Sequence, residues 1–214
     1  MNMALDERNS VHFDSAGIAP EDQARAGFYA LIGRLFSAAP DAGLLNSLAR
    51  SEGLVAQADA DFALAWARLC QAASVCEADA AAAEFDALFV GVGKPEVVLY
   101  GSYYMAGFMM EKPLARLRQH LAELGLARQS DVSEPEDHVC ALAEVMRHLI
   151  LDDSLSAIQR NERQSGFFSR HLAPWYGSLF EAIEAAPNAN VYRRVAEFAR
   201  AFLDLDRQAF EIEV

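Results

Sequence analysis

The chain has 214 residues, 53% of them hydrophobic, and its 31 acidic against 18 basic side chains give a formal net charge of −13. An acidic surface repels phosphate backbones, which argues against a nucleic-acid partner and favours a basic peptide. Three cysteines, Cys70, Cys76 and Cys140, are too few and too scattered for a disulfide framework and indicate reduced thiols in a cytoplasmic protein. No window approaches 18 apolar residues without a charge, and the N-terminus lacks a signal-peptide pattern, so we expect no membrane insertion.

The hydrophobic pattern predicts an all-α fold, a single-domain helical bundle with a loop-rich middle. Ala and Leu dominate the apolar residues, and both lose little side-chain freedom in a helix. Residues 1–18 are polar and aperiodic and predict a flexible N-terminal arm, followed by one all-helical domain over residues 19–214. Proline is favoured in the first turn of a helix, so Pro20 is expected to open the first helix, which ends before Pro40.

Apolar residues at i, i+3, i+4 and i+7 predict the remaining helices. These are expected at about residues 44–48, 62–73, 77–92, 113–124 and 133–150, in a stretch that ends at residue 172, and at residues 174–187 and 195–205. Residues 91–102 (GVGKPEVVLYGS) contain three glycines and a proline and predict a loop instead.

A polar hexapeptide, SEPEDH, stands at the predicted start of the helix that continues to residue 150. Ser133 and Glu136 have the spacing of a capping box, in which each side chain accepts a backbone N–H of the other residue. A capping box does not explain the further acid Glu134, nor the pair Asp137 and His138. These three residues therefore indicate a function beyond starting the helix.

The aromatic segment LYGSYY at residues 99–104 lies in the non-periodic part of the chain. An aromatic loop that contains a glycine and lies beside carboxylates suits a peptide that carries arginines next to apolar residues. Such a peptide would combine bidentate guanidinium–carboxylate pairing with hydrophobic burial. The two segments together predict a receptor for an arginine-bearing apolar peptide.

The segment Gly91–Lys94 resembles part of a phosphate-binding loop but does not fit one. A P-loop needs a glycine five residues before the Gly-Lys pair and a hydroxyl after the lysine, and Leu88 and Pro95 occupy those positions. We expect a turn there.

A metal site deserves weighing because Asp137, His138, Cys140, Glu144 and His148 share one predicted helix. At about 100° per residue, His138 and Cys140 point to opposite sides, and no two histidines have the i, i+4 spacing of metal ligands. We therefore expect an ordinary polar helix face and no metal.

A hydrolase-type enzyme that uses Ser102 with Asp137 and His138 is the alternative to a binding protein. Ser102 lacks the second glycine of a nucleophile elbow, and no strand precedes it. The sequence therefore favours a protein without catalytic residues.

An ordered series of motifs resembles the TorD/DmsD family of redox-enzyme maturation chaperones, which includes NarJ-like relatives. The series comprises FDALFVG at 85–91, YGSY at 100–103, Pro113 with LR at 117–118 and GL at 125–126, EPEDH at 134–138, FF at 167–168, HL at 171–172 and PW at 174–175. The resemblance extends from about residue 25 to residue 205 and covers nearly the whole chain.

The resemblance implies an all-helical cytoplasmic chaperone without enzymatic activity. Such a chaperone binds the twin-arginine leader, and also the folded body, of a molybdopterin oxidoreductase of the DMSO/TMAO reductase or formate dehydrogenase type. It holds the client during cofactor insertion, before export by the twin-arginine translocase. Carried over by position, leader binding falls on Trp66, Leu88, Phe89, Tyr100, Gly101, Ser102, Asp137 and His138, to which the acidic pattern adds Glu134 and Glu136.

No bound cofactor is expected, but the resemblance leaves open weak binding of a guanine nucleotide or of the molybdopterin cofactor. A scaffold that delivers the molybdopterin nucleotide is accordingly a second alternative. Arg116 and Arg118 would contribute to phosphate binding in that case, although the low Lys and Arg content of the chain counts against it.

Overall fold

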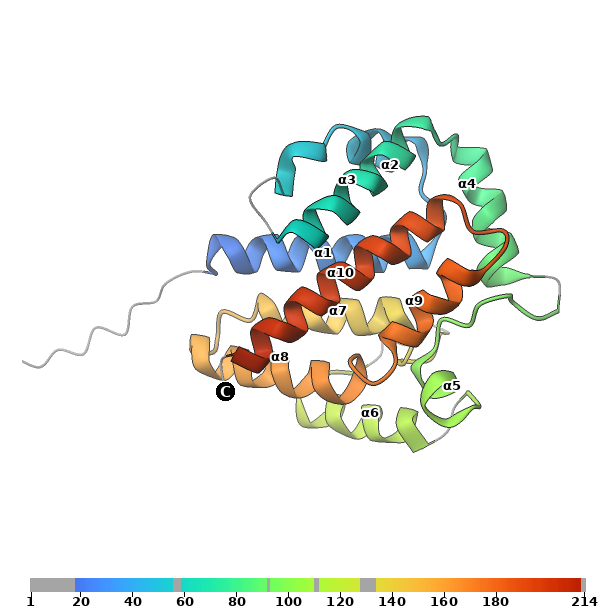
Figure 1. The fold of residues 1–214 in the computed structure, drawn as a ribbon. Coiled ribbons are helices and arrows are strands. Elements are labelled where there is room, and N and C mark those ends of the chain that lie inside the picture. Colours follow the sequence, from blue (N-terminus) through green and yellow to red (C-terminus); the bar gives the residue numbers. More distant parts are fainter. Residues whose placement is uncertain (1–17, 56–58, 92, 110–111, 128–133, 213–214) are drawn as a thin grey trace, which may run out of the picture.

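A computed structural model of the chain describes residues 18–55, 59–91, 93–109, 112–127 and 134–212. Within these ranges it contains ten α-helices and one isolated β-bridge but no strand, so the predicted all-α fold is confirmed (Figure 1). The predicted flexible arm, apart from Ile18, lies outside the described residues. Among the residues described, no helix is both long and apolar enough to cross a membrane.

The helices follow one another with short connections. They are α1 (Pro20–Ser37), α2 (Ala42–Ala49), α3 (Ala60–Val75), α4 (Ala78–Phe85), α5 (Gly101–Ala106), α6 (Lys112–Glu123), α7 (Val139–Ile150), α8 (Ala157–His171), α9 (Tyr176–Ala185) and α10 (Val191–Ile212). A 3₁₀ turn, η1 (Glu52–Val55), follows α2, and a π-helical turn, η2 (Asp86–Val90), continues α4.

Helices α1 and α7 pack against each other through the middle of the molecule (Figure 1). Helices α2, α3 and α4 lie on one side of this pair, α6 and α8 lie on the other, and α10 runs obliquely across to contact α3, α9 and α8. Gly33 on α1 sits where the pair is close, because a Cβ there would lie 3.4 Å from Glu144 Oε1 and 3.8 Å from the Cys140 carbonyl oxygen. This contact brings the middle of α7 over α1.

A buried carboxylate ties α1 to α10. Asp206, which is 3% exposed, accepts a hydrogen bond from Arg25 Nε at 2.7 Å and one from the Tyr29 hydroxyl at 2.6 Å. Arg25 also donates to Gln164 on α8 at 3.1 Å. Every partner of this carboxylate is a donor, so its charge is compensated inside the bundle.

The predicted start of α7 at Ser133 is wrong. The helix begins at Val139, with His138 as its N-cap, and Glu136 lies in a turn before it. Ser133 itself lies outside the described residues. The chain is held extended just before the helix because the Val139 N–H donates to the Leu99 carbonyl at 3.0 Å. The helix start is fixed by this bond to a segment forty residues away and by the local cap that His138 supplies.

The predicted loop over residues 91–102 extends too far toward the C-terminus, because α5 already begins at Gly101. The predicted helix 77–92 is regular only to Phe85 and then widens into η2. Helix α5 has six residues and η1 has four, and such short elements contain too few apolar positions to show a helical period.

Candidate functional site

The aromatic segment and the acidic segment that the sequence singled out lie side by side. Tyr100 and His138 form an antiparallel bridge. The Gly101 N–H donates to the Asp137 carbonyl at 2.9 Å, and the Tyr100 and His138 rings meet edge to face with centroids 5.0 Å apart. The predicted juxtaposition of these two segments is therefore confirmed.

The Asp137 side chain holds the two segments together from the inside. It is 4% exposed, and its Oδ2 accepts the main-chain N–H of Ser102 at 2.8 Å. Its Oδ1 is buried and accepts no hydrogen bond within the described part of the chain. On the other side of the α5 start, Gly101 packs so tightly that a Cβ would lie 2.9 Å from two atoms of the Trp175 indole. The first turn of α5 is thus clamped between Asp137 and Trp175.

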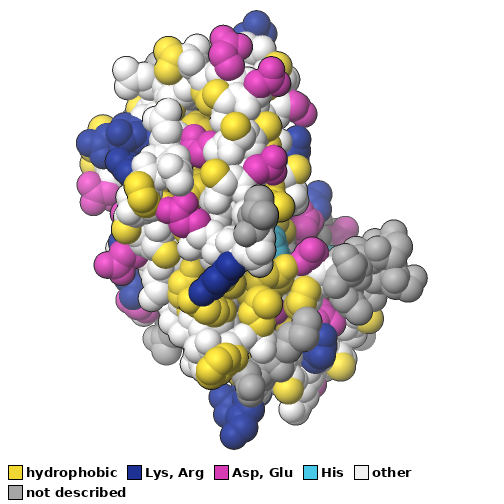
Figure 2. All heavy atoms as spheres, turned by 90° about the vertical axis from the view of Figure 1, so that its right-hand side faces the viewer, with side chains coloured by type: hydrophobic (Ala, Val, Ile, Leu, Met, Phe, Trp, Pro, Cys, Tyr) yellow, Lys and Arg dark blue, Asp and Glu magenta, His cyan; other side chains and the backbone are white. Residues whose placement is uncertain are grey.

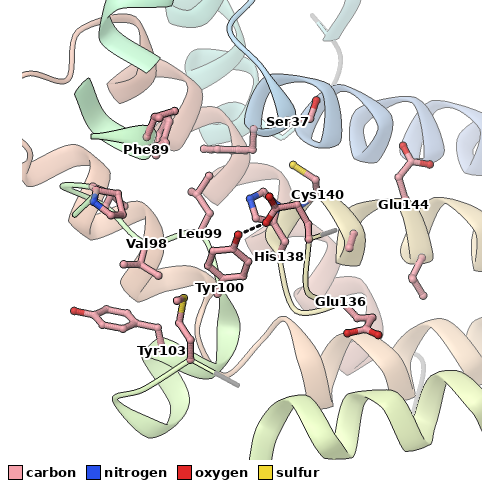
Figure 3. A pocket seen from close by; sticks show the side chains of 18 of the residues that line it. Ser37, Phe89, Val98, Leu99, Tyr100, Tyr103, Glu136, His138, Cys140 and Glu144 are labelled. Atoms are coloured by element: carbon pink, nitrogen blue, oxygen red, sulfur yellow. Dashed lines mark hydrogen bonds between the residues drawn. The ribbon is translucent and has the colours of Figure 1, made fainter. Parts of the chain in front are cut away.

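An open groove of about 1090 Å³ lies beside this clamp. Its walls include the end of α1, α4 and η2, residues 93–100 and one face of α7 from Cys140 to His148 (Figure 3). This volume lies slightly above the roughly 300–1,000 Å³ typical of small-molecule pockets. The groove therefore has room for several residues of an extended peptide.

One side of the groove is mainly apolar, and the opposite side carries carboxylates. Phe89, Val98 and Tyr103 lie together on one side, while Glu136 and Glu144 lie on the opposite side (Figure 3). On the face of the molecule where α4, α5 and α9 lie, hydrophobic side chains gather beside acidic side chains and a histidine (Figure 2). A surface of this kind suits a ligand that is apolar at one end and cationic at the other.

Groups in the centre of the groove are held neutral. The Tyr100 hydroxyl donates to the Glu134 carboxylate, and burial together with this bond raises the pKa of Tyr100. Burial lowers the pKa of His138 and raises the pKa of the Cys140 thiol to about 12. The acidic side chains that line the groove are Glu134, Glu136 and Glu144, and Lys94 lines it as a cation.

His138 is positioned as a helix cap rather than as a base. Its Nδ1 accepts the main-chain N–H of Cys140 at 3.2 Å, and because that N–H can only donate, the neutral ring must carry its proton on Nε2. Ser102, the nucleophile in the hydrolase alternative, is 1% exposed and does not line the groove. Within the described part of the chain, no three His, Cys, Asp or Glu side chains are grouped as metal ligands.

The predicted site residues divide into two sets. Five line the groove: Phe89, Tyr100, Glu134, Glu136 and His138. Five do not: Trp66, Leu88, Gly101, Ser102 and Asp137. Leu88 is fully buried in the core, while Gly101, Ser102 and Asp137 build the clamp behind the groove. The role of each of these ten residues in peptide binding stays a prediction.

Trp66 lies in a separate apolar hollow of about 630 Å³ between α1, α2, η1 and α3. Its indole Nε1 donates to the Ser51 carbonyl at 2.8 Å, and its ring packs edge to face against Phe28 with centroids 5.5 Å apart. The structure therefore does not bring Trp66 to the groove.

Several groove residues were not among those predicted for the site. Phe36 and Phe85 line the apolar wall. Cys140, Glu144 and His148 line the other wall from α7. Their i, i+4, i+8 spacing places them on one face of the helix, which is the signal that could have identified that face.

Comparison with known proteins identifies the family of the chain. Residues 56–181 match the family described as the nitrate reductase delta subunit. Because the match covers more than half of the chain, the chain belongs to this family of NarJ- and TorD-type proteins, and the expected TorD/DmsD resemblance is confirmed.

Named relatives are chaperones. The chain is 26% identical over 136 residues to chaperone protein TorD of Vibrio cholerae, a match that spans 61% of this chain and 62% of that protein. It is 24% identical to chaperone protein TorD of Shewanella pealeana over 97% of this chain and 99% of that protein. For chaperone protein TorD of Shewanella loihica the identity is 27%, over 89% and 94% of the two chains.

Proposed function

We propose that this protein is a cytoplasmic chaperone of redox-enzyme maturation and that its groove binds the twin-arginine leader of a molybdopterin oxidoreductase subunit. The relatives named TorD support the chaperone class. The observation that carries leader binding is a single groove with an apolar wall and a carboxylate wall. A leader that contains arginines and an apolar stretch is complementary to both walls.

The protein acts by binding and has no turnover of its own. It holds the leader, and with it the folded body of the client, until the molybdopterin cofactor has been inserted, and so delays export by the twin-arginine translocase. The protonated Cys140 thiol and the capping role of His138 support a binding site over a catalytic one. The net charge of −13 favours encounter with a basic leader.

Titration calorimetry with a synthetic twin-arginine leader peptide tests this proposal. Val98 is half-buried in the apolar wall, and Val98→Asp should weaken binding at least about tenfold, because a carboxylate would be placed against the apolar part of the leader. The matched control is Ile158→Asp, since Ile158 is 73% exposed on α8 and lies outside the groove. Absence of binding to the unchanged protein, or equal affinity of both variants, would contradict the proposal.

A further inference from the structure

We infer that the leader lies in the groove in one direction, with an arginine at Glu144 on α7 and its apolar segment against Val98 and Tyr103. This inference rests on the proposed leader binding and adds to it the carboxylate that receives the arginine. Figure 3 shows Glu144 on one side of the groove and both apolar contacts on the other, with Tyr100, His138 and Cys140 between them.

The other carboxylates at the site already serve the fold. Asp137 is buried and accepts the N–H of Ser102, so an arginine could reach it only by opening the clamp. Glu136 forms an ion pair with Arg118 of α6 at 2.9 Å. Glu134 accepts the Tyr100 hydroxyl. A bound arginine would compete with an existing contact at each of these three positions.

Glu144 carries a much weaker contact. It pairs with Arg147 in its own helix at 3.4 Å, and the two side chains are 57% and 45% exposed, so little is lost when this pair is exchanged. Arg147 does not line the groove, whereas Glu144 does. Gly33 on α1 packs beside the carboxylate, because a Cβ there would lie 3.4 Å from Oε1, so the α1 side is closed and the carboxylate is open toward the groove. A guanidinium can therefore reach Glu144 from the groove.

The opposite end offers apolar contacts and the cation Lys94, but no carboxylate. Tyr103 and Val98 lead to Met109, which lines the groove and is 51% exposed. Met105 and Phe108, on the same short stretch of chain, are 39% and 71% exposed. Exposed apolar clusters mark interaction sites, and methionine side chains adapt to different apolar partners. This end therefore receives the apolar segment and cannot compensate a guanidinium.

A double-mutant cycle between Glu144 and the peptide tests the arginine end. Glu144→Gln should lower the affinity for the leader about tenfold, the loss expected for one charge-assisted hydrogen bond. For a leader in which the arginines are replaced by glutamine, this variant and the unchanged protein should have equal affinity. Glu181→Gln is the matched control, because Glu181 is an exposed glutamate on α9 outside the groove. Equal loss with both peptides overturns the pairing.

Photo-crosslinking tests the direction independently. A benzophenone amino acid beside the arginines should crosslink to α7 around Glu144, and one at the end of the apolar segment should crosslink to residues 97–105. The reversed pattern overturns the inference while leaving the proposed function intact. If the leader does not bind the unchanged protein at all, the proposed function itself fails, so the two failures are distinguishable.

Discussion

The carboxylate of Asp137 accepts the main-chain N–H of Ser102 at 2.8 Å, although 35 positions separate the two residues. A second bond, from the Gly101 N–H to the Asp137 carbonyl at 2.9 Å, runs beside it. Both donors belong to the first turn of α5, so this one acidic residue fixes where α5 begins relative to α7. Tyr100, immediately before that turn, is thereby held in the groove. Asp137 thus positions Tyr100, and its carboxylate faces the protein interior.

Replacement of Asp137 by alanine should lower the free energy of unfolding by about 1–3 kcal/mol, because the Ser102 N–H would stay buried without its acceptor. Urea denaturation measures this loss. Asp153→Ala is the matched control, since Asp153 is exposed and its replacement should change stability by less than about 0.5 kcal/mol. Equal stability of the two variants would show that the clamp does not stabilise the fold.

Replacement of Asp137 by asparagine separates positioning from charge. The amide oxygen of asparagine can still accept the Ser102 N–H, while the negative charge is removed. We expect Asp137→Asn to keep leader affinity within about threefold, a difference below 1 kcal/mol. Calorimetry with the leader peptide measures this. A loss of a hundredfold instead would support direct pairing between Asp137 and a leader arginine, as the sequence predicted.

Gly101 is required by the contact with Trp175, which is 1% exposed and cannot move aside. Gly101→Ala would place a Cβ 2.9 Å from the indole and should lower the free energy of unfolding by about 1–3 kcal/mol through overpacking. Gly166→Ala is the control, because Gly166 lies inside α8 with open space around it. That substitution should raise stability by about 0.5–1 kcal/mol, and thermal unfolding of the pair distinguishes the two signs.

The parts of the fold that were predictable from sequence are those with local causes. The start of α1 at Pro20 and its end before Pro40 depend on residues in or next to the helix itself, and both are confirmed. The start of α7 was missed because it depends on a hydrogen bond from Val139 to Leu99, and no local pattern reports a bond across forty residues. Short elements such as α5 were not predicted, because they contain no repeating apolar period.

The site was predictable only in part for a related reason. Tyr100 and Glu134 stood out because a loop aromatic and a surplus acid have no role in a helix, and both line the groove. Glu144 did not stand out, because a glutamate on a polar helix face is ordinary until α1 is placed beside it. Trp66 was misplaced because its segment packs on the other side of α1.

Stability should fall on acidification through the His120–His171 pair. His171 Nε2 lies 2.9 Å from His120 Nδ1, and burial, aided by His120 and Arg170, lowers the pKa of His171 to about 4. Burial also lowers the pKa of His120. Between pH 6.5 and about 4, the unfolded chain therefore holds more protons on His171 than the folded chain does. The stabilisation is complete above pH 6.5 and is lost as the pH falls toward 4.

Urea denaturation at a series of pH values, with and without His171→Gln, measures this contribution. The unchanged protein should lose stability more steeply on acidification, by at most about 1.4 kcal/mol per pH unit for one group. The glutamine can still hydrogen bond to His120 but does not titrate, so the difference between the two curves isolates His171. Parallel curves across this window would contradict the assignment.

Asp206 also carries a prediction for stability. Asp206→Ala would leave Arg25 half-buried without its 2.7 Å partner and the buried Tyr29 hydroxyl without its acceptor. The loss should be about 1–3 kcal/mol, because the buried Tyr29 hydroxyl stays without its acceptor while Arg25 keeps its ion pair with Asp22 at 2.9 Å. Glu211→Ala, on the same helix but exposed, should change the free energy of unfolding by less than about 0.5 kcal/mol. Urea denaturation compares the two variants, and a loss below 1 kcal/mol for Asp206→Ala would mean that water reaches the Tyr29 hydroxyl and replaces the carboxylate.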